Sequence, residues 1–321
     1  MPDLPRRAMI AASGLAIAAA TAAVGAPLAQ PRSLAGQSVL ITGASSGFGY
    51  LGAVHYARLG AKVFATMRNL PRPEADELRA LARNEALDIT VLELDVLSDQ
   101  QVARAVSQAE AAAGGALDIL VNKAGIVIGG PVELQGMDAT QLAFDTNVLG
   151  YQRLARAVLP AMRARKAGLI FNVSSQVGRV IMPGMGIYSA TKFAVESMSE
   201  QLAYELAPHG IEVVIIQPGG YRTRVGANRA RYTQPLLETN EAERLAAYPD
   251  MVEQMRATPP AGEPRPGEPD PMDIPLAIAE IAQMPPGTRP PRAGGRTTVS
   301  PPSRHFRELL GGAWRRTELD G

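Results

Sequence analysis

Tyr188 and Lys192 stand four residues apart, in the sequence YSATK at the start of a segment with helical periodicity. Residues at this spacing lie on one face of a helix, so both side chains can point into one pocket. A phenol ordinarily has a pKa of about 10, and a nearby ammonium group lowers it, which favours Tyr188 as an acid/base near neutral pH. Ser175 follows an apolar run, and its hydroxyl could donate a hydrogen bond to a substrate oxygen. Each of these residues taken alone is more often structural, so the rest of the chain decides their role.

A glycine-rich stretch, TGASSGFG at Thr42–Gly49, follows the first apolar run and precedes a helical segment. Glycines allow a tight turn and let the backbone approach a pyrophosphate at a helix N-terminus, where free N–H groups favour negative charge. By itself such a stretch could be a plain strand–helix turn, but after the first strand of an alternating chain it predicts a dinucleotide site. The binding residues expected there are Gly43, Ser45, Ser46, Gly47, Phe48 and Gly49.

The second apolar run ends in ATMR, with Arg68 last and no carboxylate. A site that prefers NAD commonly places an acid there to hold the ribose hydroxyls of the adenosine. An arginine can instead pair with a 2′-phosphate through charge-assisted hydrogen bonds. Arg68 could also be a solvated loop residue, but together with the missing acid it predicts NADP(H) as the cofactor.

The elements that must position these residues alternate along the chain after Gly36. Apolar runs of strand length alternate with amphipathic segments of helix length, as in a parallel sheet covered on both faces. Strands are expected at Ser38–Thr42, Lys62–Thr66, Ile89–Leu94, Ile119–Val121, Leu169–Val173 and Glu212–Gln217, and a seventh near Arg296–Val299. Helices are expected at Gly47–Leu59, Glu74–Arg83, Ser98–Ala113, Asp138–Arg165 and Ile187–Ala207. We therefore predict an α/β fold, a single-domain Rossmann-type doubly wound parallel sheet with helices on both faces.

The C-terminal part of the chain has a different composition. Thirteen of the 26 prolines fall between Pro259 and Pro302, which excludes long helices and strands there except at Asp273–Met284. We interpret 36–257 as a dinucleotide-binding catalytic domain with a substrate-loop region at 221–257. Residues 258–321 are predicted to be an irregular elaboration of the same domain.

Composition excludes several classes of function. The 321 residues carry a formal net charge of +1, and 46% are hydrophobic, which is typical of a globular protein with a large core. No basic run is present, which argues against a nucleic-acid partner. The absence of cysteine excludes disulfides, thiolate catalysis and cysteine–zinc sites. The three histidines, His55, His209 and His305, share no metal-ligand spacing, so no metal site is predicted.

The first thirty residues have the features of a targeting segment. Arg6 and Arg7 precede the uncharged stretch Ala8–Ala29, which is built largely from alanine, glycine and serine and is too weakly hydrophobic for an ordinary spanning helix. An arginine pair before such a stretch resembles a twin-arginine export signal, although the residues around the pair depart from the usual pattern. We predict a signal peptide at 1–30 and an exported, periplasmic protein without stable membrane insertion. A disordered or amphipathic extension of a cytoplasmic protein and an uncleaved anchor are the alternatives.

Taken together, the motifs resemble the short-chain dehydrogenase/reductase family over about residues 36–300. The family pattern TGxxxGxG is matched by Thr42–Gly49, and Ser175, Tyr188 and Lys192 have the family spacing. Asn147, in FDTNVLG, matches the fourth member of that catalytic set. Further matching positions, expected to bind the cofactor, are Asp95, Val96, Asn122, Ala124, Gly125, Pro218, Gly219 and Thr223. The chain departs from the family at Lys123, where a second asparagine is usual.

The resemblance implies reversible hydride transfer between the nicotinamide of NADP(H) and a small-molecule carbonyl or alcohol. Tyr188 would transfer the proton, and Lys192 would lower the pKa of Tyr188 and hold the nicotinamide ribose. Ser175 would orient the substrate oxygen, and Asn147 would position a water that links Lys192 to solvent. A homodimer or homotetramer is also implied. The alternative is a non-catalytic dinucleotide-binding sensor or scaffold, which has no use for all four residues.

The substrate pocket is expected to be apolar. Apolar residues lie close to Tyr188 and in the segment that covers the site in the family, although all of them could be ordinary core. They are Met182, Met185, Ile187, Val225, Leu236, Leu237, Leu245 and Met251. These positions predict a medium-sized, apolar ketone, aldehyde or secondary alcohol.

The N-terminal hypothesis can be tested by replacing Arg6 and Arg7 with lysine. This keeps the charge but should abolish twin-arginine recognition, so processing and export in fractionated cells should stop. Export of the variant at the normal level, or a native chain that stays full-length in the cytoplasm, would show that the N-terminus is not such a signal.

Overall fold

The computed structural model describes residues 33–257, 267–294 and 299–300. The predicted signal peptide at 1–30 lies outside the described residues, as does most of the segment 296–299 for which a seventh strand is predicted. Among the described helices, none combines the length and the apolar character that crossing a bilayer requires.

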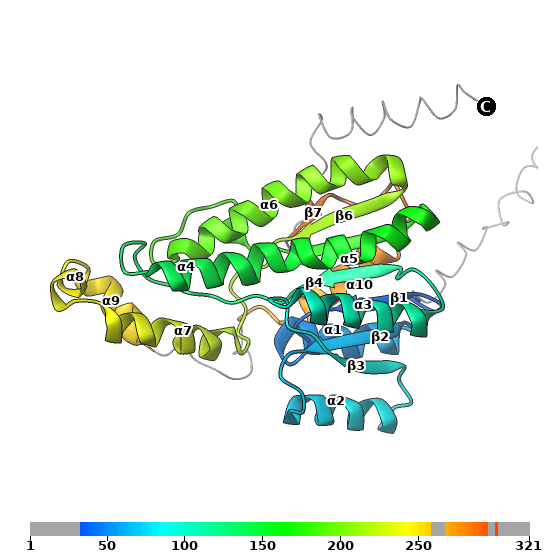
Figure 1. Ribbon diagram of the computed structural model, residues 1–321, viewed down its shortest axis with the longest axis horizontal. Coiled ribbons are helices and arrows are strands. Elements are labelled where there is room, and N and C mark those ends of the chain that lie inside the picture. Colours follow the sequence, from blue (N-terminus) through cyan, green and yellow to red (C-terminus); the bar gives the residue numbers. More distant parts are fainter. Residues whose placement is uncertain (1–32, 258–266, 295–298, 301–321) are drawn as a thin grey trace, which may run out of the picture. The chain divides into compact units, whose positions relative to one another are not determined.

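One sheet, with the strand order β3-β2-β1-β4-β5-β6-β7-β8, forms the centre of the fold (Figure 1). Strands β1 to β7 run parallel, and β8 pairs antiparallel with β7. Their bounds are β1 (Ser38–Ile41), β2 (Lys62–Met67), β3 (Ile89–Glu93), β4 (Ile119–Asn122), β5 (Gly168–Val173), β6 (Ile211–Ile216), β7 (Arg292–Ala293) and β8 (Val299–Ser300). The predicted doubly wound α/β fold is confirmed, and the first six strands agree with the sequence prediction to within one residue at each end.

Both faces of the sheet are buried, which explains the continuous apolar runs. Along β1, Val39 and Ile41 pack on one side and Leu40 packs on the other. The first side is covered by α1 (Gly47–Arg58), α2 (Pro73–Asn84) and α10 (Asp273–Ala282). The second is covered by α3 (Asp99–Ala113), α5 (Gly150–Arg165) and α6 (Gly186–Leu206). Because parallel strands all end at the same edge, the segments after β1, β2, β3, β4, β5 and β6 meet there.

The long helix predicted at Asp138–Arg165 is wrong in one respect. The structure has α4 (Met137–Phe144), a π-helical turn at Asp145–Leu149, and then α5. The apolar spacing continues across this turn, so periodicity alone cannot reveal it. The polar Asn147 at the centre of this turn is fully buried.

The region 221–257 is helical rather than a loop. It forms α7 (Val225–Thr239), α8 (Ala242–Ala246) and α9 (Pro249–Arg256), drawn in yellow in Figure 1. Apolar side chains of α7 and α9, including Leu236 and Met255, form a small core with the segment after β4. That packing stabilises helices whose sequence has low mean hydropathy and a proline inside α7, so the elements were not predicted. Asp273–Met284, the stretch where the proline content allows a helix or strand, contains the helix α10.

Candidate active site

The turn between β1 and α1 is shaped by three glycines. Gly43 and Gly47 have positive φ angles of 72° and 54°, a region that favours glycine. Gly49 has no room for a side chain, because a Cβ there would lie 2.4 Å from the Gly43 carbonyl oxygen. Ser46, which precedes α1, uses its side chain to cap none of the first helical N–H groups. The start of α1 therefore keeps backbone donors and a hydroxyl for an anionic ligand.

Lys123 fastens this turn to the end of β4. Its Nζ donates to the carbonyl oxygens of Gly43 and Ser46, at 3.3 Å each. The backbone N–H groups of Lys123 and Ala124 donate to the Thr42 hydroxyl at 2.9 and 3.0 Å. The residue that departs from the family pattern thus ties two segments of the site together.

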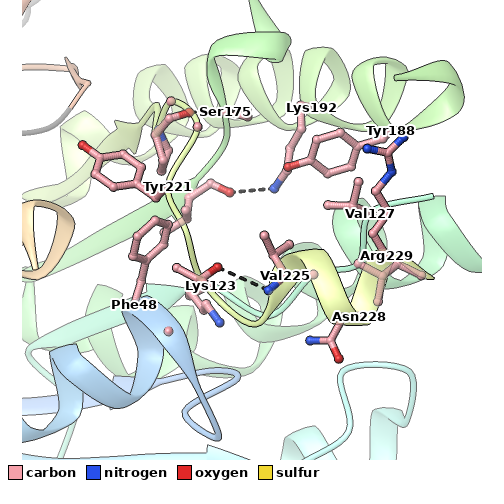
Figure 2. Close-up of a pocket in the computed structure, with 18 of the residues that line it drawn as sticks. Phe48, Lys123, Val127, Ser175, Tyr188, Lys192, Tyr221, Val225, Asn228 and Arg229 are labelled. Atoms are coloured by element: carbon pink, nitrogen blue, oxygen red, sulfur yellow. Dashed lines mark hydrogen bonds between the residues drawn. The ribbon is translucent and has the colours of Figure 1, made fainter. Parts of the chain in front are cut away.

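Ser175, Tyr188 and Lys192 meet at the carboxyl end of β5 (Figure 2). Lys192 lies one helical turn after Tyr188 on α6, as the spacing predicts, and its Nζ is 5.7 Å from the centroid of the Tyr188 ring. The same Nζ donates to the Val173 carbonyl oxygen at 2.8 Å. The Ser175 hydroxyl donates to the Pro218 carbonyl oxygen at 3.4 Å.

Asn147 supports these residues from the π-helical turn. Its Oδ1 accepts from the Ile126 N–H at 2.8 Å, and its Nδ2 donates to the Ile126 carbonyl oxygen at 2.9 Å. Nδ2 also donates to the Thr191 hydroxyl at 3.1 Å, and that hydroxyl donates to the Tyr188 carbonyl oxygen at 2.7 Å. The amide therefore holds the first turn of α6 through Thr191.

Asn122 and Asn172 join the central strands below the site. Asn122 Nδ2 donates to Asn172 Oδ1 at 2.9 Å, and Asn172 Nδ2 donates to the Ser199 hydroxyl at 2.8 Å. Asn122 is 1% exposed, so it lies in the interior of the sheet. These bonds connect β4, β5 and α6, which together carry much of the site.

The segment after β6 forms another side of the candidate site. A Cβ at Gly219 would lie 2.5 Å from Gln176 Nε2, so only glycine fits there without a shift. A Cβ at Gly47 would lie 3.2 Å from that of Thr223, which shows that Thr223 packs against the glycine turn. Pro218 and Gly219 follow β6 as predicted and lie beside Ser175 through the Pro218 carbonyl oxygen.

Arg68 and Asp95 follow β2 and β3, where the adenosine is expected. Arg68 Nη2 donates to the Tyr232 hydroxyl of α7 at 3.1 Å. Asp95 lies close enough for its charge to contribute to a raised pKa of Arg68, after the larger contribution of the Tyr232 hydrogen bond. Asp95 Oδ1 accepts from the Leu97 N–H at 3.0 Å, and Val96 is buried. Tyr232 was not anticipated, because nothing in the sequence links α7 to the end of β2.

A cavity of about 540 Å³ connects most of these segments. The predicted residues that line it are Ser46, Gly47, Phe48, Gly125, Ser175, Tyr188, Lys192, Pro218, Gly219 and Thr223. The predicted residues outside its lining are Gly43, Ser45, Gly49, Arg68, Asp95, Val96, Asn122, Ala124 and Asn147. Lining residues that sequence reasoning missed include Asn228, Arg229 and Tyr221, whose ring stacks edge-on against Phe48 with centroids 5.3 Å apart.

The apolar lining is smaller than predicted. Met185 and Val225 line the cavity, but Ile187, Leu236, Leu237 and Leu245 belong to the small core of α7 and α9 instead. Met182 is exposed, and Met251 is also absent from the lining. Packing among α7, α8 and α9 accounts for the positions of Leu236, Leu237 and Leu245, which lie in that core and not at the cavity.

The family follows from comparison with known proteins. The model of the short chain dehydrogenase family matches residues 37–233, more than half of the chain. The protein belongs to the short-chain dehydrogenase family. A short-chain dehydrogenase from Streptomyces avermitilis has a similar solved structure, with a TM-score of 0.64 and 29% identity over 88% of this chain and 94% of that chain.

Two relatives extend the comparison within the family. The 3-ketodihydrosphingosine reductase of Bacteroides thetaiotaomicron is 39% identical over 193 residues, 60% of this chain and 67% of the relative. Retinol dehydrogenase 8 of Bos taurus is 41% identical over 188 residues, 57% of this chain and 58% of the relative. The chain thus matches only part of the length of either relative.

The electrostatics of this short-chain dehydrogenase site differ from what residue spacing predicts. Burial raises the pKa of Tyr188 to about 12, and hydrogen bonding by the Ser175 hydroxyl opposes this increase. Burial lowers the pKa of Lys192 to about 7; the Glu196 carboxylate raises it and the Lys123 charge lowers it further. Burial also lowers the pKa of Lys123 to about 8. The expected lowering of the Tyr188 pKa is therefore not seen, because burial disfavours the phenolate and the ammonium alike.

Replacing Lys192 with methionine should change how stability depends on pH. The Lys192 pKa is about 7 in the folded protein and about 10.4 in an unfolded chain. Between these values the unfolded chain binds more protons, so Lys192 makes the free energy of unfolding rise with pH. Urea unfolding at several pH values in this window should show a smaller rise for K192M. K166M, at the exposed end of α5, controls for the loss of a lysine, and an unchanged slope in K192M would contradict the lowered pKa.

Proposed function

We propose that this short-chain dehydrogenase is an NADP(H)-dependent oxidoreductase that interconverts a carbonyl compound and an alcohol. One observation carries the proposal: a serine hydroxyl, a tyrosine phenol and a lysine amine line the same cavity as the glycine turn at the start of α1. The names of the two relatives, a keto-compound reductase and a retinol dehydrogenase, support this chemistry.

The residues present fit a dinucleotide. Gly43, Gly47 and Gly49 bring backbone close to the N-terminus of α1, and Ser46 leaves its hydroxyl uncommitted to a helix cap. A pyrophosphate is stabilised at such a helix start by free N–H groups and by the helix dipole. When bound, the nicotinamide supplies or accepts the hydride.

The protein's own residues handle the proton and the oxygen. In reduction, the carbonyl carbon gains a hydride while its oxygen takes the phenolic proton of Tyr188, which yields the alcohol. The raised pKa keeps Tyr188 protonated at neutral pH, and an alkoxide forming at the carbonyl oxygen is more basic than a phenolate. Ser175 donates a hydrogen bond to the same oxygen, and the ammonium form of Lys192 stabilises the phenolate that remains. Oxidation of the alcohol runs through the reverse steps.

Arg68 supports the preference for NADP(H). It is the first residue after β2, no carboxylate lies in that strand, and its guanidinium is partly buried. A planar guanidinium matches the geometry of a phosphate group. The proposed contact is the 2′-phosphate of the adenosine ribose.

We also propose, from the sequence alone, that residues 1–30 direct export by a twin-arginine route. That route carries folded proteins, so the enzyme could cross the membrane with its cofactor already bound. The proposal thus requires a cofactor that dissociates slowly.

The Tyr188→Phe variant tests the reaction. It keeps the ring and should leave cofactor binding unchanged, while turnover falls by roughly 100-fold or more because the proton donor is lost. The assay is a screen of ketones and aldehydes with NADPH, followed at the nicotinamide absorbance. Near-normal turnover in the variant would show that Tyr188 is not the acid/base, and cofactor binding without any turnover in the native protein would favour a sensor.

The Arg68→Gln variant tests the cofactor preference. It should weaken NADPH binding by roughly 10- to 100-fold and NADH binding far less, because only NADPH has a 2′-phosphate. Fluorescence titration of both cofactors measures the two effects. Arg79→Gln, on the outer side of α2, is the matched control. Equal losses for both cofactors would mean that Arg68 does not recognise the phosphate.

A further inference from the structure

Arg229 places a positive charge in the wall of the active-site cavity. It belongs to α7 and lines the same cavity as Ser175, Tyr188 and Lys192. In Figure 2, Arg229 and Tyr188 lie on one side of the view, and Phe48 and Tyr221 lie on the other. The guanidinium is thus at the part of the cavity that holds the phenol, away from the aromatic pair beside the glycine turn.

The guanidinium is seated against Gly129, in the segment that follows β4. A Cβ on Gly129 would lie 2.7 Å from both Nε and Nη2 of Arg229, and 3.0 Å from Cζ. Any larger residue at this position would displace the arginine. The absence of a side chain at Gly129 is therefore what leaves space for the charged group at the cavity wall.

Arg229 differs from the other cations of the cavity in having no protein acceptor within the described part of the chain. Arg222 forms two hydrogen bonds of 2.7 Å with the Glu268 carboxylate. Lys123 donates to carbonyl oxygens of the glycine turn, and Lys192 donates to the Val173 carbonyl oxygen. Burial lowers the pKa of Arg229 with no acid to oppose it. A partly buried charge without a counter-ion is unfavourable, so the position is explained by a ligand that brings the opposite charge.

The chemistry of the wall specifies that ligand. A guanidinium binds a carboxylate through two parallel hydrogen bonds. A phosphate dianion would leave a net negative charge beside a single unpaired cation, whereas one carboxylate matches it. Apolar side chains of Ile126, Val127, Met185 and Val225 line the same cavity. They fit a ligand in which a short hydrocarbon chain joins the carboxylate to the carbonyl or alcohol group.

We propose that Arg229 binds a carboxylate of the substrate, so that this enzyme acts on oxo acids and the corresponding hydroxy acids. The inference rests on the proposed carbonyl–alcohol oxidoreduction and names its substrate class. It revises the wholly apolar substrate that the sequence predicts. One end of the substrate lies at Tyr188 and Ser175, and the other lies at Arg229.

A kinetic comparison tests the assignment. The substrates are 4-oxopentanoate, 6-oxoheptanoate and 8-oxononanoate, each with its methyl ester as the neutral counterpart. With NADPH, the native enzyme should prefer at least one acid over its ester by about 10- to 100-fold in kcat/KM. Arg229→Gln should remove this preference by lowering kcat/KM for the acid and not for the ester. Equal kcat/KM values for acids and esters in the native enzyme would overturn the carboxylate site and leave the proposed reaction intact.

Two further variants separate a local effect from misfolding. Gly129→Ala retains the arginine but occupies its place, so it should also reduce the preference for the acid. Arg231→Gln removes the same charge from an exposed position of α7 and should leave both substrates unaffected. If Arg231→Gln lowered kcat/KM for the acid as much as Arg229→Gln does, the effect would come from the general charge of α7, and the proposal would be overturned.

A binding measurement keeps the test independent of turnover. Calorimetry with hexanoate, hexanamide and hexyl phosphate, in the presence of NADP⁺, should show tightest binding of hexanoate to the native protein. Arg229→Gln should weaken hexanoate binding by about 10-fold or more and leave hexanamide unchanged. Equal binding of hexanoate and hexanamide, or a preference for hexyl phosphate, would overturn the carboxylate assignment. Arg229-dependent binding of hexanoate in a protein that reduces no carbonyl compound would support the site and contradict the proposed reaction.

Discussion

The close approach of the chain to itself between β1 and α1 is the constraint on which the site depends. A side chain at Gly49 would collide with the Gly43 carbonyl oxygen, so α1 can begin there only because the residue is glycine. This turn lies beside the end of β4, since β1 pairs with β4, and Thr42 accepts the N–H groups that follow β4. The other segments of the site follow the carboxyl ends of parallel strands, so they lie at the same edge of the sheet. The positions of the glycine turn and of Ser175, Tyr188 and Lys192 are thus consequences of one strand order.

Residues whose positions are set by one element were predictable from the sequence. Tyr188 and Lys192 share a face of α6 because helical geometry fixes their separation, and Ser175 lies at the sheet edge because it follows β5. Features that depend on packing between distant segments were not predictable. The bond from Arg68 to Tyr232 and the contact of Arg229 with Gly129 join residues that no local pattern connects. The shifted pKa of Tyr188 belongs to the same group, because burial exists only in the folded chain. The π-helical turn is local, but the apolar spacing continues across it and does not reveal it.

Lys123 changes the character of the site more than a substitution for asparagine suggests. Its ammonium group bonds to two carbonyl oxygens of the glycine turn, which adds a fixed positive charge near the start of α1. The same charge lowers the pKa of Lys192, after the larger effect of burial, so Lys123 also affects the protonation of that second amine. Structural support for the turn and the protonation of Lys192 are therefore set partly by one side chain. The central strands, in contrast, are still joined by Asn122 and Asn172.

The hydrogen bond between Arg68 and Tyr232 makes two binding events thermodynamically dependent on each other. Tyr232 lies on α7 three residues after Arg229, so the same helix contacts Arg68 at the end of β2 and carries a residue of the cavity wall. A ligand that competes with Tyr232 for the Arg68 guanidinium changes the free energy with which α7 stays in place. By reciprocity, a ligand that holds α7 from the cavity side alters the affinity at Arg68 by the same factor. Ligand binding at Arg68 and ligand binding at the cavity wall thus become one coupled equilibrium.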